Sequence, residues 1–226
     1  MLSLENNITT LKMHIDSACF NANRSNKEVN LLAVSKTQSA ETIKLAYQAG
    51  LRQFGENYVS EAQEKILQLP KDIIWHFIGP IQSNKSRIIA ENFDWVQSID
   101  RLKLVKRLND QRPEHLPPLQ CLIQVNISGE EQKAGIAPDQ IALLVEAINN
   151  SPRLQLRGLM AIPKATEHKQ ESAAMFAEME KLFKQQQALT PQIDTLSMGM
   201  SNDMQTAIMH GSTMVRIGTA IFGKRN

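Results

Sequence analysis

This chain has little of what nucleic-acid-binding or membrane proteins require. Lys and Arg outnumber Asp and Glu by only 25 to 23, which leaves a formal net charge of +2. Such a balance gives no electrostatic reason to expect nucleic acid or an acidic membrane as a partner, so a small molecule is the more natural one. No stretch approaches the roughly 18 apolar residues of a membrane-spanning helix, and the N-terminus carries no apolar signal segment. We therefore expect a cytoplasmic protein.

Cysteine and histidine are too few and too scattered to predict a metal site. The two cysteines, Cys19 and Cys121, form no CxxC pair, and the five histidines form no HExxH pattern. Without a Cys/His cluster a metal site has no support, and the two thiols are expected to be reduced and buried. His76 lies in an apolar run, IIWHFIG, and is interpreted as a core histidine.

The rest of the chain alternates short apolar runs with amphipathic stretches. This unit recurs about eight times, an alternation that favours a parallel α/β fold. The predicted strands are residues 31–36, 52–57, 73–79, 95–99, 121–127, 156–162, 195–200 and 214–222. A further helix is predicted at about residues 1–23, because apolar residues there recur at spacings of three and four: Leu4, Ile8, Leu11, Ile15 and Ala18.

Periodicity alone leaves open whether the strands close into a barrel or form an open, doubly wound sheet. The number of units matches a barrel, and no GxGxxG motif follows the first strand, as a dinucleotide-binding open sheet would usually require. We predict a single (β/α)8 TIM barrel domain over residues 1–226, with the extra N-terminal helix packed on it. Two charged breaks, 128–135 and 163–171, are then expected to be loops at its C-terminal face, where chemistry sits.

Lys36 ends the first predicted strand and is therefore expected at the mouth of the barrel. A lysine whose pKa is lowered by partial burial or a neighbouring cation can form a Schiff base with an aldehyde. The alternative is an ordinary solvated lysine, which is the more frequent role at a strand end.

The C-terminal segment concentrates glycines and hydroxyl residues, as a phosphate site would. Ser201 follows a predicted strand and precedes a helical run, so it can cap the helix and offer backbone N–H groups to an anion. Gly218 and Thr219 are predicted in the last strand, where a missing side chain admits a phosphate and a hydroxyl adds a donor. Alternatively, Gly199, Gly211 and Gly218 serve turns and close packing.

Two further polar residues stand at strand positions that could face a ligand. Arg216 alternates with Gly218 and is expected to point into the barrel, where a buried guanidinium needs a partner. That partner could be a ring nitrogen or phosphate of a ligand, or a carboxylate such as Asp203. Asn57 ends the second predicted strand and could either bind a ligand hydroxyl or cap the following helix.

Taken together, several motifs resemble the pyridoxal phosphate homeostasis proteins over nearly the whole chain. They are AVSKT around Lys36, FGENY ending at Tyr58, HFIGPIQSNK from His76, GLMAIP from Gly158, and SMGMSND with GSTMVRIGTAIFG near the end. The resemblance implies the fold type III barrel found at the N-terminus of alanine racemase. It also implies pyridoxal 5'-phosphate (PLP) on Lys36, phosphate contacts at Ser201, Gly218 and Thr219, Arg216 near the pyridine nitrogen, and Asn57 in the pocket.

The resemblance further implies a regulator or carrier of PLP rather than an enzyme with established turnover. PLP-dependent apo-enzymes are then the conceivable recipients, and a monomer is expected. The chain is also shorter than racemases, which add a β-rich domain carrying a catalytic tyrosine. The alternatives are a racemase-like PLP enzyme, and a barrel that binds a phosphorylated metabolite without a covalent bond.

One position departs from the pattern of this family. Many members read SKTKP where this chain reads SKTQS, so Gln38 replaces a second lysine. A relay of PLP through that position is therefore in doubt. Lys133 and Lys224 are the alternative secondary amines.

Overall fold

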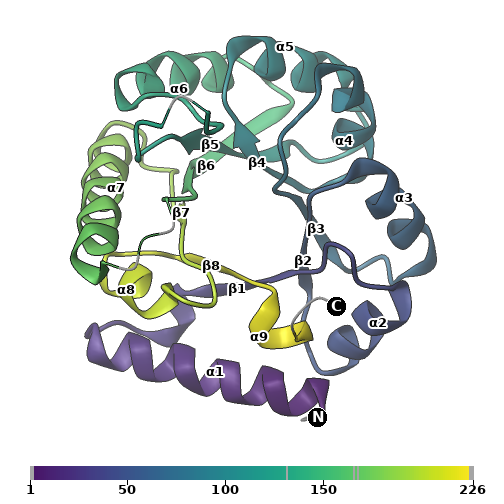
Figure 1. The fold of residues 1–226 in the computed structure, drawn as a ribbon. Helices are drawn as coiled ribbons and strands as arrows, with labels where there is room; N and C mark the ends of the chain where they lie inside the picture. The colour runs from purple at the N-terminus through teal and green to yellow at the C-terminus, as the bar shows by residue number, and fades with distance from the viewer. Residues whose placement is uncertain (1–2, 131, 165, 167, 224–226) are drawn as a thin grey trace.

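Parallel strands form a closed barrel at the centre of the computed structural model (Figure 1), which describes residues 3–130, 132–164, 166 and 168–223. In that part of the chain the strands follow one another around the barrel in chain order, and β1 pairs with β8 to close it. The strands are β1 Asn30–Val34, β2 Gln53–Glu56, β3 Ile74–Phe77, β4 Trp95–Ile99, β5 Leu119–Val125, β6 Leu154–Ala161, β7 Thr195–Ser197 and β8 Met214–Ile217.

Helices surround the barrel on its outside (Figure 1). They are α1 Leu4–Asn21, α2 Ala40–Gln48, α3 Val59–Gln68, α4 Ser86–Asn92, α5 Leu102–Gln111, α6 Ile141–Asn149, α7 Lys169–Leu189, α8 Met204–Met209 and α9 Thr219–Phe222, with short 3-10 turns η1 Asn26–Glu28, η2 Ser83–Lys85 and η3 Pro138–Gln140. The predicted (β/α)8 barrel with an extra N-terminal helix is confirmed. Among the described residues, no helix combines the length and apolarity that crossing a membrane would take.

The N-terminal helix α1 forms where the apolar stripe predicts it. Ser3 caps its first turn, because the Ser3 hydroxyl accepts a hydrogen bond from the Asn6 N–H at 3.3 Å. The stripe residues Ile8, Leu11 and Ile15 are buried. They pack this helix against α8 and α9, across the outside of the barrel (Figure 1).

The sheet has a buried region on each side. Outward-facing residues such as Phe54 and Val96 pack against the helices. Inward-facing residues fill the barrel lumen, and they include apolar Leu32, Leu122, Met160 and Met214 together with polar His76, Gln97, Ser197 and Arg216, all buried. Branched apolar side chains normally dominate the lumen of such a barrel, so polar residues at its centre point to a functional requirement.

The last predicted strand, 214–222, is wrong beyond its fourth residue. β8 ends at Ile217, and the chain turns at Gly218 into the short helix α9. The physical reason is a contact distant in sequence: Ile221 is buried, and its carbonyl accepts a hydrogen bond from the Asn7 side chain of α1 at 3.0 Å. Gly218 and Thr219 therefore lie at the start of a helix.

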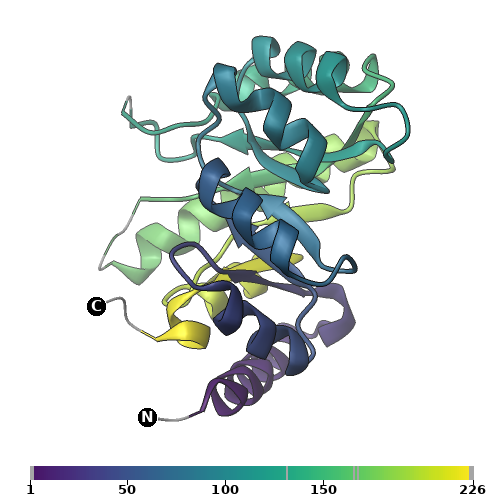
Figure 2. The same ribbon diagram turned by 90° about the vertical axis from the view of Figure 1, so that its right-hand side faces the viewer.

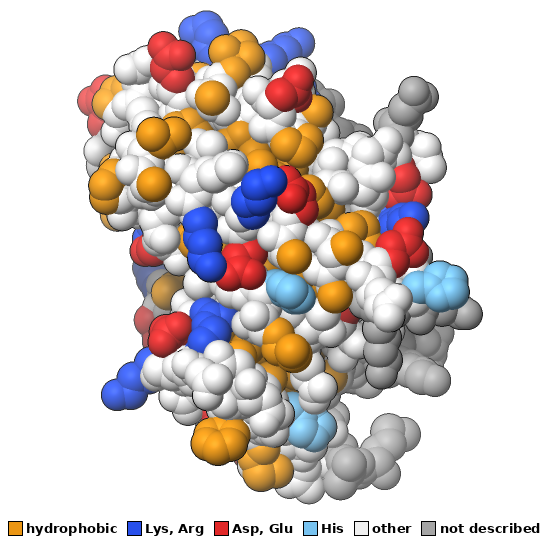
Figure 3. Space-filling model, turned by 90° about the vertical axis from the view of Figure 1, so that its left-hand side faces the viewer, with side chains coloured by type: hydrophobic (Ala, Val, Ile, Leu, Met, Phe, Trp, Pro, Cys, Tyr) orange, Lys and Arg blue, Asp and Glu red, His pale blue; other side chains and the backbone are white. Residues whose placement is uncertain are grey.

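The loops that follow β5 and β6 extend from one end of the barrel (Figure 2), where the breaks 128–135 and 163–171 were expected. The second break is shorter than predicted, because α7 begins at Lys169, and residues 131, 165 and 167 lie outside the described residues. The two loops are tied together, because the Lys164 N–H donates to the Ser128 hydroxyl at 2.9 Å. Ion pairs join Lys133 to Glu130 and Lys164 to Glu171. On the face that carries α7, the described side chains of Lys, Arg, Asp and Glu are interspersed (Figure 3).

Gly158 allows β6 to pack against its neighbours at a bulge. The pairing of β5 with β6 shifts register between Cys121 and Leu122, and Gly158 lies opposite this shift with φ of +151°. A Cβ atom at Gly158 would lie 1.9 Å from the carbonyl oxygen of Thr195 in β7. Only glycine fits this position without displacing backbone.

We expect Gly158→Ala to lower the free energy of unfolding by at least about 2 kcal/mol, because it adds both an unfavourable φ and a backbone clash. Gly129→Ala is the matched control: Gly129 also has a positive φ, of +66°, but a Cβ atom there would meet nothing within 4 Å. In this control the free energy of unfolding should fall by only about 1 kcal/mol. Urea unfolding measures both, and equal losses would mean that the clash is relieved at no cost.

Candidate functional site

The predicted site residues lie at the carboxyl ends of neighbouring strands. Lys36 follows β1 by two residues, Asn57 directly follows β2, and Gly218 directly follows β8. Ser201 follows β7 by four residues. Because β7, β8, β1 and β2 are consecutive around the barrel, these positions share one sector of its C-terminal face.

Lys36 is half-buried and lies in a tight turn rather than in the strand itself. The turn is held at its start, where the Ser35 N–H donates to the Gly55 carbonyl at 3.0 Å, and closed by a Gln38 N–H bond to the Ser35 carbonyl at 3.0 Å. Thr37 has φ of +65°. A residue with a side chain adopts this conformation at a cost of roughly 1–2 kcal/mol, so the surrounding structure must hold it there.

Backbone donors gather at the ends of β7 and β8. Within the described part of the chain, no protein acceptor is present for the backbone N–H groups of Ser201, Asn202, Gly218 and Thr219. The Ser201 and Thr219 side chains are exposed. Gly218 lies close to β1, because a Cβ atom there would lie 3.3 Å from the Val34 carbonyl oxygen. Unpaired N–H groups beside a glycine and two hydroxyls are donors that suit a phosphate.

Ser201 does not cap the helix that follows it, which corrects one prediction. The helix α8 begins at Met204 with Asp203 before it, and Ser201 lies in the preceding turn. The Asp203 carboxylate accepts a hydrogen bond from the Met200 N–H at 2.6 Å and thereby fixes this turn. Gly199 and Gly211 do serve turns, since their φ values are +95° and +80°.

Asn57 is not a helix cap. The helix α3 begins at Val59 with Tyr58 in the capping position and no side-chain cap bond. The Asn57 backbone is packed against the segment that follows β3, because a Cβ atom at Gly79 would lie 2.3 Å from the Asn57 carbonyl oxygen. Its side-chain oxygen Oδ1 is buried, with no hydrogen-bond partner in the described structure. A buried acceptor left unpaired is costly, and a ligand hydroxyl would satisfy it.

Arg216 points into the lumen and is 4% exposed. Its guanidinium donates to the Ser197 hydroxyl at 2.8 Å and to the Ala161 carbonyl at 2.8 Å. The alternative of a salt bridge to Asp203 is therefore wrong, since both partners are neutral and Asp203 is engaged by the turn. Burial lowers the pKa of Arg216 to about 10, which still leaves the group charged at neutral pH.

A chain of hydrogen bonds runs from Arg216 across the lumen. The Ser197 hydroxyl donates to Gln97 Oε1 at 2.7 Å, and Gln97 Nε2 lies 3.0 Å from His76 Nδ1. Since a guanidinium can only donate, Ser197 must accept from it and donate onward, which turns the Gln97 amide so that Nε2 donates to His76. His76 is thus neutral and carries its proton on Nε2.

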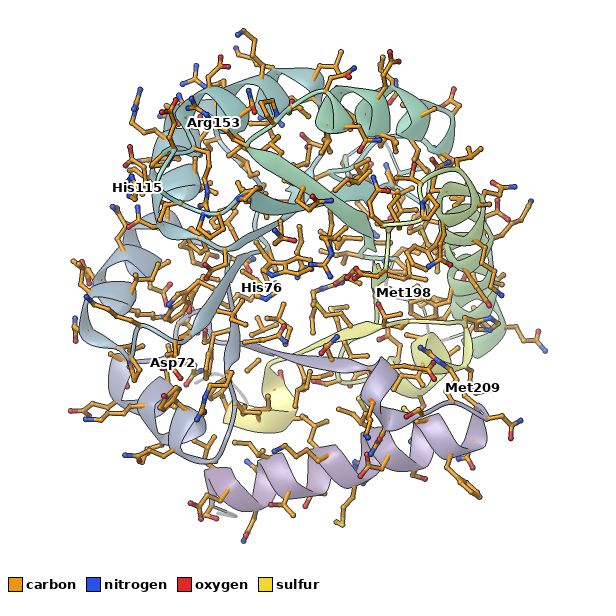
Figure 4. The ribbon with its side chains drawn as sticks, turned by 180° about the vertical axis from the view of Figure 1, so that it is seen from behind. Asp72, His76, His115, Arg153, Met198 and Met209 are labelled. Carbon is orange, nitrogen blue, oxygen red and sulfur yellow. The ribbon has the colours of Figure 1, made fainter. Side chains whose placement is uncertain are left out.

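The core interpretation of His76 is confirmed. The side chain is fully buried inside the ring of strands and stacks on Trp95, with ring centroids 5.1 Å apart (Figure 4). Burial lowers the pKa of His76 to about 3. Gln97, which bonds to His76, and Ser197, which links Gln97 to Arg216, were not predicted from the sequence as part of the site. Both are polar residues at inward positions of buried strands, and this feature of the sequence could have indicated that they belong to a polar network in the lumen.

The two cysteines are free and buried, as predicted. Burial raises the pKa of both thiols, so both favour the protonated form. Among the described residues, no group of three or more His, Cys, Asp or Glu side chains is placed to hold a metal ion.

Comparison with known proteins agrees with this geometry. The family described as alanine racemase, N-terminal domain, matches residues 4–226. A protein of Haemophilus influenzae named pyridoxal phosphate homeostasis protein is 52% identical, over 100% of this chain and 97% of its own length. One of the same name from Escherichia coli K12 is 50% identical, over 100% and 98%. The chain belongs to the pyridoxal phosphate homeostasis protein family.

A solved structure of a more distant relative contains the cofactor. PipY of Synechococcus elongatus, in a crystal structure with PLP bound, superposes with a TM-score of 0.84 at 34% identity, covering 98% of this chain and 100% of that one. The two proteins therefore share the same barrel over essentially the full length of both chains.

The pKa of His76 makes stability depend on pH. The unfolded chain would restore its ordinary value of 6.5, so between 6.5 and about 3 the unfolded state binds one proton more than the folded state. The free energy of unfolding should then fall as pH falls through this window, by up to about 1.4 kcal/mol per pH unit. The variant His76→Gln cannot titrate at this position. Its free energy of unfolding should therefore change less steeply with pH, by up to about 1.4 kcal/mol per pH unit.

Urea unfolding of both proteins across the window measures this difference, because contributions from the shared carboxylates cancel. Parallel pH profiles would show that His76 is protonated in the folded protein.

Proposed function

We propose that this protein binds PLP covalently at Lys36 and takes part in PLP homeostasis as a carrier or regulator. The observation that carries this proposal is the sector of the barrel face described above. It combines a lysine in a fixed turn, a set of unpaired backbone N–H groups and the unpaired Oδ1 of Asn57. The names of the relatives and the PLP bound to PipY support the same cofactor.

Each end of the cofactor has a candidate partner in this sector. The N–H groups and hydroxyls of Ser201, Gly218 and Thr219 would hold the phosphate. Asn57 would pair with the ring hydroxyl, and Arg216 would lie toward the ring nitrogen. When bound, PLP supplies an aldehyde that condenses with a primary amine and a ring that can take up electron density.

Arg216 is one reason for proposing a carrier rather than an enzyme of fast turnover, and a racemase would need a base on the second face of the ring to overcome its effect. A guanidinium beside the ring nitrogen cannot accept a proton from it, and at neutral pH it does not give one up, so the nitrogen stays unprotonated. An unprotonated ring is a weak electron sink, which slows loss of the α-proton from a bound amino acid. The hydrogen bonds to Ser197 and Ala161 hold the guanidinium in place in the absence of the ligand.

Lys133 and Lys224 are the lysines considered as secondary amines for transfer of PLP. Lys133 lies on the loop after β5 and is paired with Glu130 at 2.5 Å, so it would first have to leave that partner. Lys224 lies outside the described residues. Gln38 follows the turn of Lys36 without an amine to offer. Transfer to PLP-dependent apo-enzymes, a cytoplasmic location and a monomeric state stay predictions.

Lys36→Ala should abolish the covalent adduct while leaving weak non-covalent PLP binding. The purified wild-type protein should be yellow, because the linkage between PLP and lysine absorbs visible light. Borohydride reduction followed by peptide mass spectrometry should place the adduct on the peptide that contains Lys36. Thr219→Val is the companion variant: it should weaken affinity by roughly tenfold through loss of one hydroxyl donor, yet keep the adduct on Lys36.

A reducible adduct that persists in Lys36→Ala would move the attachment site to another lysine. A wild-type protein that binds PLP without any reducible adduct would favour a non-covalent phosphate-binding barrel.

We also expect no sustained racemase, transaminase or decarboxylase turnover on common amino acids. Stoichiometric holo-protein incubated with each L-amino acid in deuterated water should show at most slow α-deuterium incorporation and no change of enantiomer ratio. A spectral shift on adding amino acid is still expected, because an amine can displace Lys36. Many turnovers of exchange that depend on Lys36 would instead identify a racemase-like enzyme.

A further inference from the structure

A buried ionic cluster lies on the outer side of the sheet, directly under the turn that holds Lys36. Its centre is Lys65 of α3, which is 5% exposed although it belongs to a surface helix. Lys65 Nζ lies 2.8 Å from Glu56 Oε1 and 2.6 Å from Glu61 Oε1. Glu56 is the last residue of β2 and is fully buried.

The same cluster holds the backbone on both sides of Lys36. Before it, the Ser35 carbonyl accepts from Lys65 Nζ at 2.9 Å, and the Ser35 hydroxyl donates to Glu56 Oε1 at 2.6 Å. After it, the Thr37 N–H donates to Glu61 Oε1 at 2.6 Å. All three protons of the Lys65 ammonium thus have acceptors, two carboxylates and one carbonyl.

These bonds explain how Thr37 keeps its positive φ. A hydrogen bond to a carboxylate is among the stronger ones in proteins, and it can offset the cost of the left-handed conformation. Without the acceptor Glu61 Oε1, the Thr37 N–H would lose its bond, and the Gln38 N–H bond to the Ser35 carbonyl would have to hold the closed turn without it. Relaxation of this turn would rotate the backbone of the neighbouring Lys36 and redirect its side chain.

We propose that Lys65 and Glu61 are positioning residues, which fix the turn around Lys36 so that its amine meets the aldehyde of PLP. The inference rests on the proposed function. It separates two determinants of binding: the outer cluster controls formation of the covalent bond, while the backbone donors at the ends of β7 and β8 control docking of the phosphate.

Two ligands distinguish these determinants. PLP has the aldehyde that reacts with Lys36, whereas pyridoxamine 5'-phosphate has the same ring and phosphate but no aldehyde. A positioning defect should therefore weaken PLP binding and leave pyridoxamine 5'-phosphate binding unchanged. Titration of the purified apo-protein with each ligand gives both dissociation constants.

Glu61→Leu and Glu61→Gln form the first pair of variants. Leucine removes the acceptor of the Thr37 N–H, whereas glutamine keeps an oxygen at that place. We expect the dissociation constant for PLP to rise about tenfold in Glu61→Leu and to return close to the wild-type value in Glu61→Gln, with unchanged pyridoxamine 5'-phosphate affinity in both.

The double variant Lys65→Met with Glu56→Gln removes the ammonium without leaving a buried carboxylate unpaired. Replacing both partners avoids the large penalty of an uncompensated buried charge, so this protein should fold. Its PLP dissociation constant should also rise about tenfold. Lys184→Met is the matched control, because Lys184 forms the same type of i,i+4 pair with Glu180 at 2.6 Å on the exposed surface of α7.

Selective loss of PLP affinity in Glu61→Leu and in the double variant, with stability near wild type by urea unfolding, supports the inference. Unchanged PLP affinity in both would overturn it, and so would an equal loss for both ligands, which would indicate general collapse of the pocket. If the wild-type protein forms no borohydride-reducible adduct, the proposed function fails and this inference falls with it.

Discussion

The buried guanidinium of Arg216 constrains the whole interior of this barrel. A guanidinium offers only donors, so each polar group that it bonds must present an acceptor, and a hydroxyl that accepts from it must donate to a further acceptor. Ser197, Gln97 and His76 satisfy this condition in one direction, from β8 across β7 and β4 to β3. A charged His76 would end the chain with two opposed donors, which is why neutrality of His76 and burial of Arg216 belong together.

On the outer side of the sheet, ionic groups rather than a chain of neutral side chains stabilise the structure. Around Lys36 the backbone adopts a turn that its sequence does not favour, and two carboxylates with one ammonium hold it. Burial raises the pKa of Glu56, while Lys65 and Ser35 oppose that shift by binding its ionised form. Oε2 of Glu56 lacks a hydrogen-bond partner in the described structure, so the cluster leaves one buried acceptor unsatisfied.

Sequence periodicity was sufficient to predict the order of strands and helices, because burial on one side of each element repeats locally. It also placed Lys36, Asn57 and Arg216 at the correct end or face of their strands. It failed where distant contacts decide: α9 forms at Gly218 because Ile221 docks against α1. Lys65 could not be singled out either, since a lysine among the polar residues of an amphipathic helix normally faces water.

The two supports lie on opposite sides of the sheet and hold different parts of the site. Arg216 is fixed by the Ser197 hydroxyl and the Ala161 carbonyl, and the outer cluster fixes the turn of Lys36 through its backbone. The backbone N–H groups proposed as phosphate donors belong to neither support, because the path of the chain after β7 and β8 sets them. On the proposal that PLP binds here, an amine that displaces Lys36 would leave both Arg216 and the backbone donors undisturbed. Loss of the covalent bond alone would then not release the cofactor, so delivery of PLP to another protein would also require the phosphate to leave its donors.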